Sequence, residues 1–188
     1  MDNPCTEFTC IEFKTNTRPV RLRIQVARDA HDVDSWLERH HSNIMGLDIE
    51  WKPTLRKNQD PGRASLLQLS SGDEALLIQL FSVETTPRLL GVLADTGVVK
   101  VGVGIQDDVS KLQADWAITV NGAVDIGAGM SLKRVVHRAT GVVLKKEKRI
   151  SLSNWEQDTL SREQIIYAGL DAWSAAEAFV ASSAEICT

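Results

Sequence analysis

The chain has 188 residues, of which 43% are hydrophobic and 24% are charged, and its formal net charge is −4. These values are typical of a folded globular domain and exclude a strongly basic nucleic-acid-binding chain, so a polyanionic partner would have to meet local basic patches. The three cysteines are odd in number and match no zinc-binding spacing, which predicts reduced thiols in an intracellular protein.

The first elements in chain order are predicted to be two strands, a helix and a buried strand. Apolar and polar residues alternate over 7–14 and 20–27, with turn residues between them, which predicts a pair of strands. Helical spacing over 29–40 predicts a helix. The segment 43–52 (NIMGLDIEWK) predicts a strongly buried strand, and 53–63 a polar loop with Pro and Gly.

The later elements alternate strands with helices. The last helix is predicted to begin after Ser161, because Ser161 and Gln164 have the spacing of an N-terminal capping box, and to end near 184. The other predictions are strands over 64–71, 74–81 and 98–104, helices over 87–93, through Val109 and Leu112, and over 131–140, and an extended segment over 116–126. This order predicts an α/β fold, a mixed β-sheet flanked by helices. We expect one domain over 1–188, with N-terminal strands and a helix over 1–42 and a core over 43–184.

Two carboxylates stand on the predicted strand GLDIEW. Asp48 and Glu50 point to the same face, because side chains alternate along a strand. Two like charges on a half-buried sheet are destabilising unless something positive lies between them, and a metal ion is the usual solution. The alternative is an edge strand with an ordinary salt bridge.

Two other segments carry acidic residues, one at the start of a predicted helix and one within the last predicted helix. The segment VGVGIQDDVSKL puts Asp107 and Asp108 just past a Gly-rich strand, at the start of a helix. The segment YAGLDAW puts Tyr167 and Asp171 on one face of the last helix, since they are four residues apart. Taken singly, Asp108 would be interpreted as a helix cap and Tyr167 as a packing residue.

These motifs in this order resemble the 3′–5′ exonucleases of the DnaQ-like, ribonuclease H-like superfamily, in the subclass with a tyrosine four residues before the last Asp. LLQL, KVGVG, SNW and the YAxxDA pattern are similar to the Werner-syndrome-type exonuclease domain. The resemblance covers roughly 43–180. It implies a ribonuclease H-like sheet flanked by helices and a metal-dependent 3′–5′ exonuclease that releases 5′-nucleoside monophosphates.

The resemblance also implies the site residues. Asp48, Glu50, Asp108 and Asp171 match the four acidic residues that hold two Mg²⁺ or Mn²⁺ ions, and Tyr167 matches the tyrosine that orients the attacking water. In this assignment Asp48 bridges both ions, Glu50 and Asp171 complete the shell of the first, and Asp108 holds the second. Asp108 is preferred to Asp107, which is expected to face solvent or to cap the helix.

Short basic segments could contact a phosphate backbone without sequence preference. The stronger candidate contains Lys145, Lys146, Lys148 and Arg149, and the weaker contains Lys52, Arg56 and Lys57. An ordinary solvated turn is the alternative for both. Of the other residues that could take part in catalysis or binding, Asp125 is expected to have a structural role, Trp155 to lie in the core and His137 to lie on the surface.

Three functions remain open. A 3′–5′ exonuclease on DNA comes first, followed by the same chemistry on RNA for decay or small-RNA trimming, and then a non-catalytic nucleic-acid-binding protein of the same fold. We expect single-stranded or 3′-recessed nucleic acid as the partner, with repair, replication or RNA-processing proteins. No apolar stretch reaches membrane-span length and no secretory signal is visible, so we expect an intracellular protein of nucleus or cytoplasm, without a membrane segment.

Overall fold

The computed structural model describes residues 8–54, 62–145 and 147–186, and side chains as far as residue 183. The strands are β1 (Phe8–Lys14), β2 (Pro19–Val26), β3 (Ile44–Trp51), β4 (Ala64–Ser71), β5 (Glu74–Gln79), β6 (Val99–Gly102) and β7 (Ala123–Asp125). The helices are α1 (Ala30–Arg39), α2 (Pro87–Ala94), α3 (Ile105–Trp116), α4 (Leu132–Thr140), α5 (Lys148–Ser151) and α6 (Arg162–Ile186).

The described strands form one mixed sheet in the order β1-β2-β5-β4-β3-β6-β7. β1 pairs antiparallel with β2, and β3, β4 and β5 form an antiparallel series. β2 lies parallel to β5, and β6 lies parallel to both β3 and β7. The carboxyl ends of β3, β5 and β6 therefore share one edge of the sheet, which is where ligands bind in open α/β sheets.

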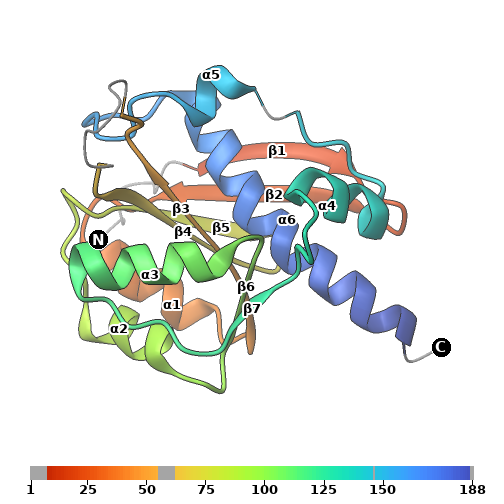
Figure 1. Ribbon diagram of the computed structural model, residues 1–188, viewed down its shortest axis with the longest axis horizontal. Coiled ribbons are helices and arrows are strands. Elements are labelled where there is room, and N and C mark those ends of the chain that lie inside the picture. The colour runs from red at the N-terminus through yellow and green to blue at the C-terminus, as the bar shows by residue number, and fades with distance from the viewer. Residues whose placement is uncertain (1–7, 55–61, 146, 187–188) are drawn as a thin grey trace, which may run out of the picture.

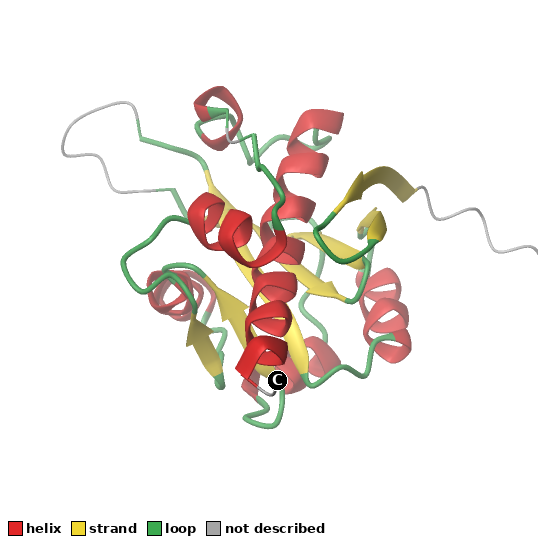
Figure 2. Cartoon of the chain, turned by 90° about the vertical axis from the view of Figure 1, so that its right-hand side faces the viewer, coloured by secondary structure: helices red, strands yellow, loops and turns green. Residues whose placement is uncertain are grey.

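Helices cover both faces of this sheet (Figure 1). On one face α1, α2 and α3 pack on alternate residues of β3, β4 and β5, with Trp36, Leu89 and Leu112 fully buried. On the other face α6 crosses the strands and α4 packs beside it. Figure 2 shows α6 lying across the sheet. Trp173 of α6 is fully buried in this second core together with Leu22 and Leu77.

The α6 helix approaches the sheet unusually closely at two glycines. A Cβ atom at Gly46 of β3 would collide with the carbonyl oxygen of Ala172 in α6. A Cβ atom at Gly169 of α6 would lie 2.6 Å from the Cδ1 atom of Ile24 in β2. Real Cβ atoms do not approach their neighbours this closely, so glycine at these positions sets the height of α6 above the sheet.

Most of the predicted elements are confirmed. The capping box of α6 is reciprocal, since Gln164 N donates to Ser161 Oγ at 3.2 Å and Ser161 N donates to Gln164 Oε1 at 2.9 Å. Trp155 is fully buried and its indole Nε1 donates to the carbonyl oxygen of Ser151 at 3.3 Å, which confirms a core role. His137 is exposed, as predicted.

One predicted segment is wrong in part, and one helix is additional. The extended segment predicted over 116–126 is a strand only over Ala123–Asp125, and Trp116 still belongs to α3. Ile118 and Val120 alternate into the core without strand pairing, because the neighbouring strand β6 has only four residues to pair with. The short helix α5 begins at Lys148, within the predicted basic segment, and continues past it to Ser151. Part of the predicted loop over 53–63, including Arg56 and Lys57, lies outside the described residues.

Candidate active site

The strand β3 presents two carboxylates on the face that α6 covers. Asp48 and Glu50 alternate with Leu47 and Ile49, which are buried in the core on the opposite face. Both carboxylates are half-buried. The sequence pattern apolar–acid–apolar–acid therefore forms a strand whose buried side anchors it and whose other side carries charge toward α6.

The helix α6 adds a third carboxylate. Tyr167 and Asp171 are one helical turn apart and only 8% and 3% exposed. The structure brings Asp171 to the two acids of β3, and ligand oxygens of Asp48, Glu50 and Asp171 lie within 4.8 Å of one another. We call these three residues the carboxylate cluster. It joins segments that are more than a hundred positions apart in the sequence.

Asp108 lies in the first turn of α3, directly after β6, and it is 8% exposed. β6 is the parallel neighbour of β3, so the helix that carries Asp108 begins at the edge of the sheet where the carboxylate cluster lies. The last residue of β6 lies close to β3, since a Cβ atom at Gly102 would lie 2.9 Å from the carbonyl oxygen of Leu47. Asp108 is not part of the group of oxygens within 4.8 Å.

Asp125 has the structural role that the sequence predicts, at the turn between β6 and α3. Its Oδ2 accepts a hydrogen bond from Gly104 N at 3.1 Å, and its Oδ1 accepts one from Gly127 N at 2.7 Å. Gly104 has a φ of 74°, a left-handed conformation that suits glycine, and it is the N-cap of α3. Asp125 thus fixes the turn from which Asp108 projects.

The neighbouring acids Asp107 and Asp108 differ in burial, while the choice of Asp108 as the site residue stays a prediction. Asp107 is exposed, which fits the prediction that it faces solvent, whereas the alternative that it caps α3 is wrong because Gly104 occupies that position. Burial, and to a smaller extent the nearby charges of Asp107 and Asp125, together raise the pKa of Asp108 to about 7.

This pKa predicts a pH-dependent stability of the metal-free protein. The folded state holds the Asp108 proton more tightly than the unfolded chain does, so the contribution of Asp108 to stability falls as pH rises from about 4 through about 7. Asp108→Asn removes this penalty. We expect it to stabilise the metal-free protein by up to about 4 kcal/mol at pH 8 and by much less at pH 5.

Thermal unfolding of both proteins in EDTA between pH 5 and pH 8 measures this difference. Asp107→Asn serves as the matched acid-to-amide control on the same helical turn, and it should give a smaller gain, because its carboxylate is exposed. A stability difference between Asp108→Asn and wild type that does not change with pH would contradict a raised pKa at Asp108.

The predicted basic segment lies beside Tyr167. Lys145 and Arg149 line, together with Tyr167, a hollow of about 520 Å³ whose other walls are mostly apolar side chains of β1, α6 and the segment after α4. The Arg149 guanidinium donates to Glu147 and Glu163 at 2.8 Å, whereas the structure gives Lys145 and Lys148 no ion pair among the described residues. Lys146 lies outside the described residues.

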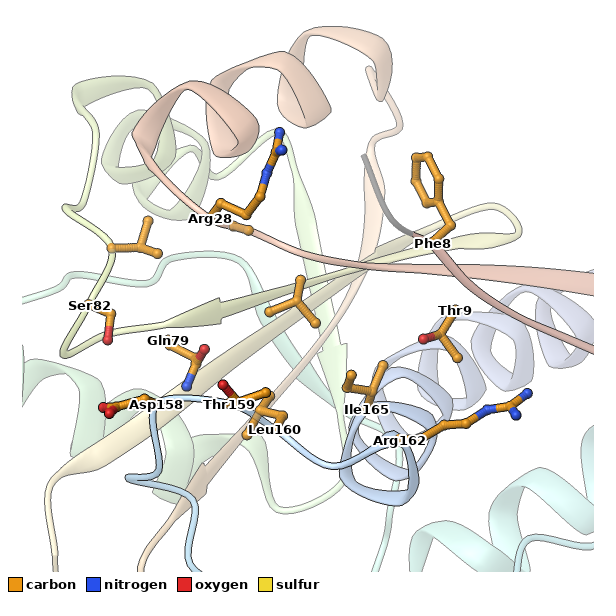
Figure 3. Close-up of a pocket in the computed structure, with 13 residues that line it drawn as sticks. Phe8, Thr9, Arg28, Gln79, Ser82, Asp158, Thr159, Leu160, Arg162 and Ile165 are labelled. Carbon is orange, nitrogen blue, oxygen red and sulfur yellow. The ribbon is translucent and has the colours of Figure 1, made fainter. Parts of the chain in front are cut away.

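A larger hollow of about 760 Å³ lies at the carboxyl ends of β2 and β5 (Figure 3). Two arginines line it, but Arg28 already donates to both carboxylate oxygens of Asp32 at 2.8 and 2.9 Å. The second arginine, Arg162, shares the hollow with Asp158. The described residues that line this hollow include neither Tyr167 nor a member of the carboxylate cluster, so we do not assign it to the candidate active site.

Comparison with models of known protein families identifies the family of this chain. A family model described as 3′–5′ exonuclease matches residues 24–180, a range that includes the carboxylate cluster, Asp108 and Tyr167. The chain belongs to the 3′–5′ exonuclease family. Family membership, which the sequence motifs predict, is therefore confirmed, while the closer likeness to Werner-type domains stays a prediction.

Relatives of this exonuclease family member include longer proteins. The chain is 35% identical over 147 residues to human exonuclease 3′-5′ domain-containing protein 2, which aligns over 69% of this chain and 23% of that protein. It is 31% identical over 150 residues to a 3′-5′ exonuclease of Arabidopsis thaliana, over 73% of this chain and 52% of the relative. The chain thus spans between about a quarter and a half of these relatives.

Solved exonuclease structures share the fold. The EXO domain of Nibbler from Aedes aegypti superposes with a TM-score of 0.75 at 20% identity, covering 87% of this chain and 88% of that one. RNase D of Escherichia coli, an exoribonuclease involved in structured RNA processing, superposes with a TM-score of 0.71 at 20% identity, covering 86% and 45%. The predicted DnaQ-like, ribonuclease H-like fold is thereby confirmed.

The donor set of this family member fits a hard divalent cation. Mg²⁺ and Mn²⁺ prefer oxygen ligands, and the carboxylate cluster offers such oxygens from three side chains within 4.8 Å. Asp171 is nearly fully buried, where an ionised carboxylate is costly without a compensating positive charge. The cluster therefore supports the predicted metal site, while the number of ions stays a prediction.

Gly46 and Gln68 lie within the motifs GLDIEW and LLQL, but sequence reasoning assigned neither of them a role, although each carries a signal in the sequence. A glycine inside a buried strand marks a close approach of another backbone, and here that backbone is α6. Gln68 is a polar residue in the otherwise apolar run SLLQL, and the structure buries it completely. Both residues lie on the face of the sheet that carries Asp48.

Proposed function

We propose that this chain hydrolyses phosphodiester bonds from the 3′ end of a nucleic acid and releases one 5′-nucleoside monophosphate at a time. The observation that carries this proposal is the meeting of Asp48, Glu50 and Asp171 in one cluster, within a chain of the 3′–5′ exonuclease family. Two Mg²⁺ or Mn²⁺ ions, when bound, would supply a water of lowered pKa and stabilise charge on the attacking and leaving oxygens.

The roles of the chain's own residues follow from their positions. Asp48, Glu50 and Asp171 would hold the cations, and Asp108, at the adjacent strand edge, would complete the set from the side of β6. Tyr167 is one helical turn from Asp171 and would orient the attacking water with its hydroxyl group, since a tyrosine with an ordinary pKa near 10 is a poor base at neutral pH.

The surroundings of Tyr167 support a nucleic-acid strand as the substrate. The hollow beside Tyr167 has apolar walls on which a base or sugar could pack, and Lys145 at its rim could contact a phosphate. Lys148 lies on the neighbouring short helix α5, and the Arg149 charge is already shared by Glu147 and Glu163. Lys145 is therefore the basic residue that we expect to matter most.

We propose a single-stranded or 3′-recessed end as the substrate, with DNA before RNA. Partners among repair, replication or RNA-processing proteins, and a place in the nucleus or cytoplasm, belong to the same proposal. None of the helices in the described part of the chain has the length and apolar character that crossing a bilayer requires.

Digestion of labelled oligonucleotides tests the proposal. Single-stranded DNA, recessed duplex DNA and RNA of one sequence, each labelled at the 5′ end, are incubated with Mg²⁺, Mn²⁺ or EDTA. We expect a ladder that shortens from the 3′ end, requires the metal and is fastest on DNA. Faster degradation of RNA would reverse the polymer preference, and no cleavage of any substrate by folded protein would contradict the enzymatic function.

Tyr167→Phe tests the role of the hydroxyl group alone. We expect kcat to fall roughly 10²-fold, because the attacking water loses an orienting hydrogen bond. The affinity for Mn²⁺ and the melting temperature should change little, since the ring keeps its packing near Trp155, with ring centroids 6.2 Å apart. Single-turnover digestion and Mn²⁺ titration measure both effects, and an unchanged kcat would assign Tyr167 to packing.

A further inference from the structure

Gln68 of β4 lies next to Asp48 in the sheet. The two residues are direct partners in the antiparallel register of β3 and β4, so their side chains point to the same face. Directly opposed residues of this kind have Cβ atoms about 5 Å apart, a distance that a glutamine side chain can span. Gln68 is fully buried, beneath the face that α6 covers.

The amide of Gln68 is unsatisfied among the described residues. Neither its Nε2 nor its Oε1 has a hydrogen-bond partner there, and both atoms are shielded from solvent. A buried amide without partners costs roughly 1–3 kcal/mol, so such groups are rare in folded proteins and call for an explanation. Other buried positions of the same strand are leucines, which pack in the core without leaving a hydrogen-bonding group unsatisfied.

The neighbouring pair in the same register provides a comparison. Ser70 of β4 is opposite Gly46, and its Oγ is also buried without a partner. Ser70 is two residues farther along β4 than Gln68, and its partner Gly46 is two residues before Asp48 on β3, so Ser70 lies farther from the carboxylate cluster. Gln68 and Ser70 therefore lie on the same face of the same strand, and both are buried. They differ in that Gln68 is opposite a carboxylate residue and Ser70 is opposite a glycine.

We propose that Gln68 is a positioning residue for the Asp48 carboxylate. Its Nε2 donates to an Asp48 oxygen once a divalent cation is bound and holds that carboxylate in the orientation that the cation needs. This inference rests on the proposed function. A neutral amide suits this role because it favours the ionised carboxylate without adding a positive charge, whereas a lysine or arginine would compete with the cation.

Gln68→Met tests the inference, because methionine has nearly the same shape and no hydrogen-bonding group of comparable strength. We expect the affinity for Mn²⁺ alone, measured by calorimetry, to fall about 10- to 100-fold, as for other residues that orient metal ligands. The melting temperature in EDTA should stay the same or rise, since a buried unsatisfied amide is removed. The value of kcat should fall while KM for a DNA oligonucleotide stays within about twofold.

Ser70→Ala is the matched control. It removes a buried, unpartnered polar atom from the same face of the same strand, and we expect its affinity for Mn²⁺ to equal that of the wild type. An unchanged Mn²⁺ affinity in Gln68→Met would overturn the inference. Loss of the folded state in Gln68→Met would also overturn it, because the amide would then serve the sheet rather than the site.

Asp48→Asn separates this inference from the proposed function. If wild-type protein binds Mn²⁺ and Asp48→Asn does not, the carboxylate cluster is the metal site, and the result with Gln68→Met then decides the role of the amide. If the wild-type protein binds no Mn²⁺, the proposed function itself fails, whatever Gln68→Met does.

Discussion

Asp48→Asn is expected to reduce metal-dependent degradation of single-stranded DNA by roughly 10³-fold or more, equivalent to about 4 kcal/mol of transition-state stabilisation. Asp48 has Glu50 two residues away on β3 and Gln68 directly opposite on β4. Its ligand oxygen is within 4.8 Å of those of Glu50 and Asp171. The substitution keeps the shape of the side chain and removes the charge that a cation would need.

The stability of the same variant should change in the opposite direction. Without metal, Asp48→Asn relieves repulsion among three carboxylates, so its melting temperature in EDTA should be equal to or above that of the wild type. Added Mn²⁺ should raise the melting temperature of the wild type only, because binding to the folded state stabilises it. Initial rates of oligonucleotide digestion and thermal unfolding measure the two effects.

Asp158→Asn is a suitable control, since Asp158 is exposed and its carboxylate is not among the oxygens that lie within 4.8 Å of one another in the cluster. It should match the wild type in both assays. Full nuclease activity in Asp48→Asn would show that the carboxylate cluster is not the catalytic site. A destabilised, inactive variant would instead assign Asp48 a mainly structural role.

Gly46→Ala is expected to impair stability and activity together. The added methyl group would collide with the carbonyl oxygen of Ala172 and crowd Ser70, so α6 must move away from β3. Overpacking of this kind costs about 1–3 kcal/mol. Asp171 directly precedes Ala172, so the carboxylate cluster opens, and a displacement of about 1 Å at a catalytic group can cost about 10²-fold in rate.

Gly91→Ala gives a matched control for this substitution. Gly91 lies in α2, where an added Cβ atom has open space around it, so alanine should stabilise the helix by about 0.5–1 kcal/mol and leave activity unchanged. Chemical denaturation and digestion rates measure both variants. If Gly46→Ala loses stability but keeps the wild-type rate, the height of α6 does not control the geometry of the cluster.

Much of the fold was predictable because the signals are local. Alternation identifies β1 and β2 and the turn between them, and the capping box of Ser161 and Gln164 marks the start of α6 to the residue. The segment over 116–126 was predicted less well, because whether alternating residues form a strand depends on the length of the neighbouring strand β6. A sequence window does not contain that neighbour.

Residue identity and spacing are enough to tell which chemical groups are available and which of them share a face of one strand or helix. Spacing of two on a strand joins Asp48 to Glu50, and spacing of four on a helix joins Tyr167 to Asp171, because backbone geometry within one element is fixed. That these two pairs meet depends instead on how β3 and α6 pack against each other. Strand order, register and close packing depend on contacts between distant segments, such as the approach of α6 at Gly46 and the pairing of Gln68 with Asp48.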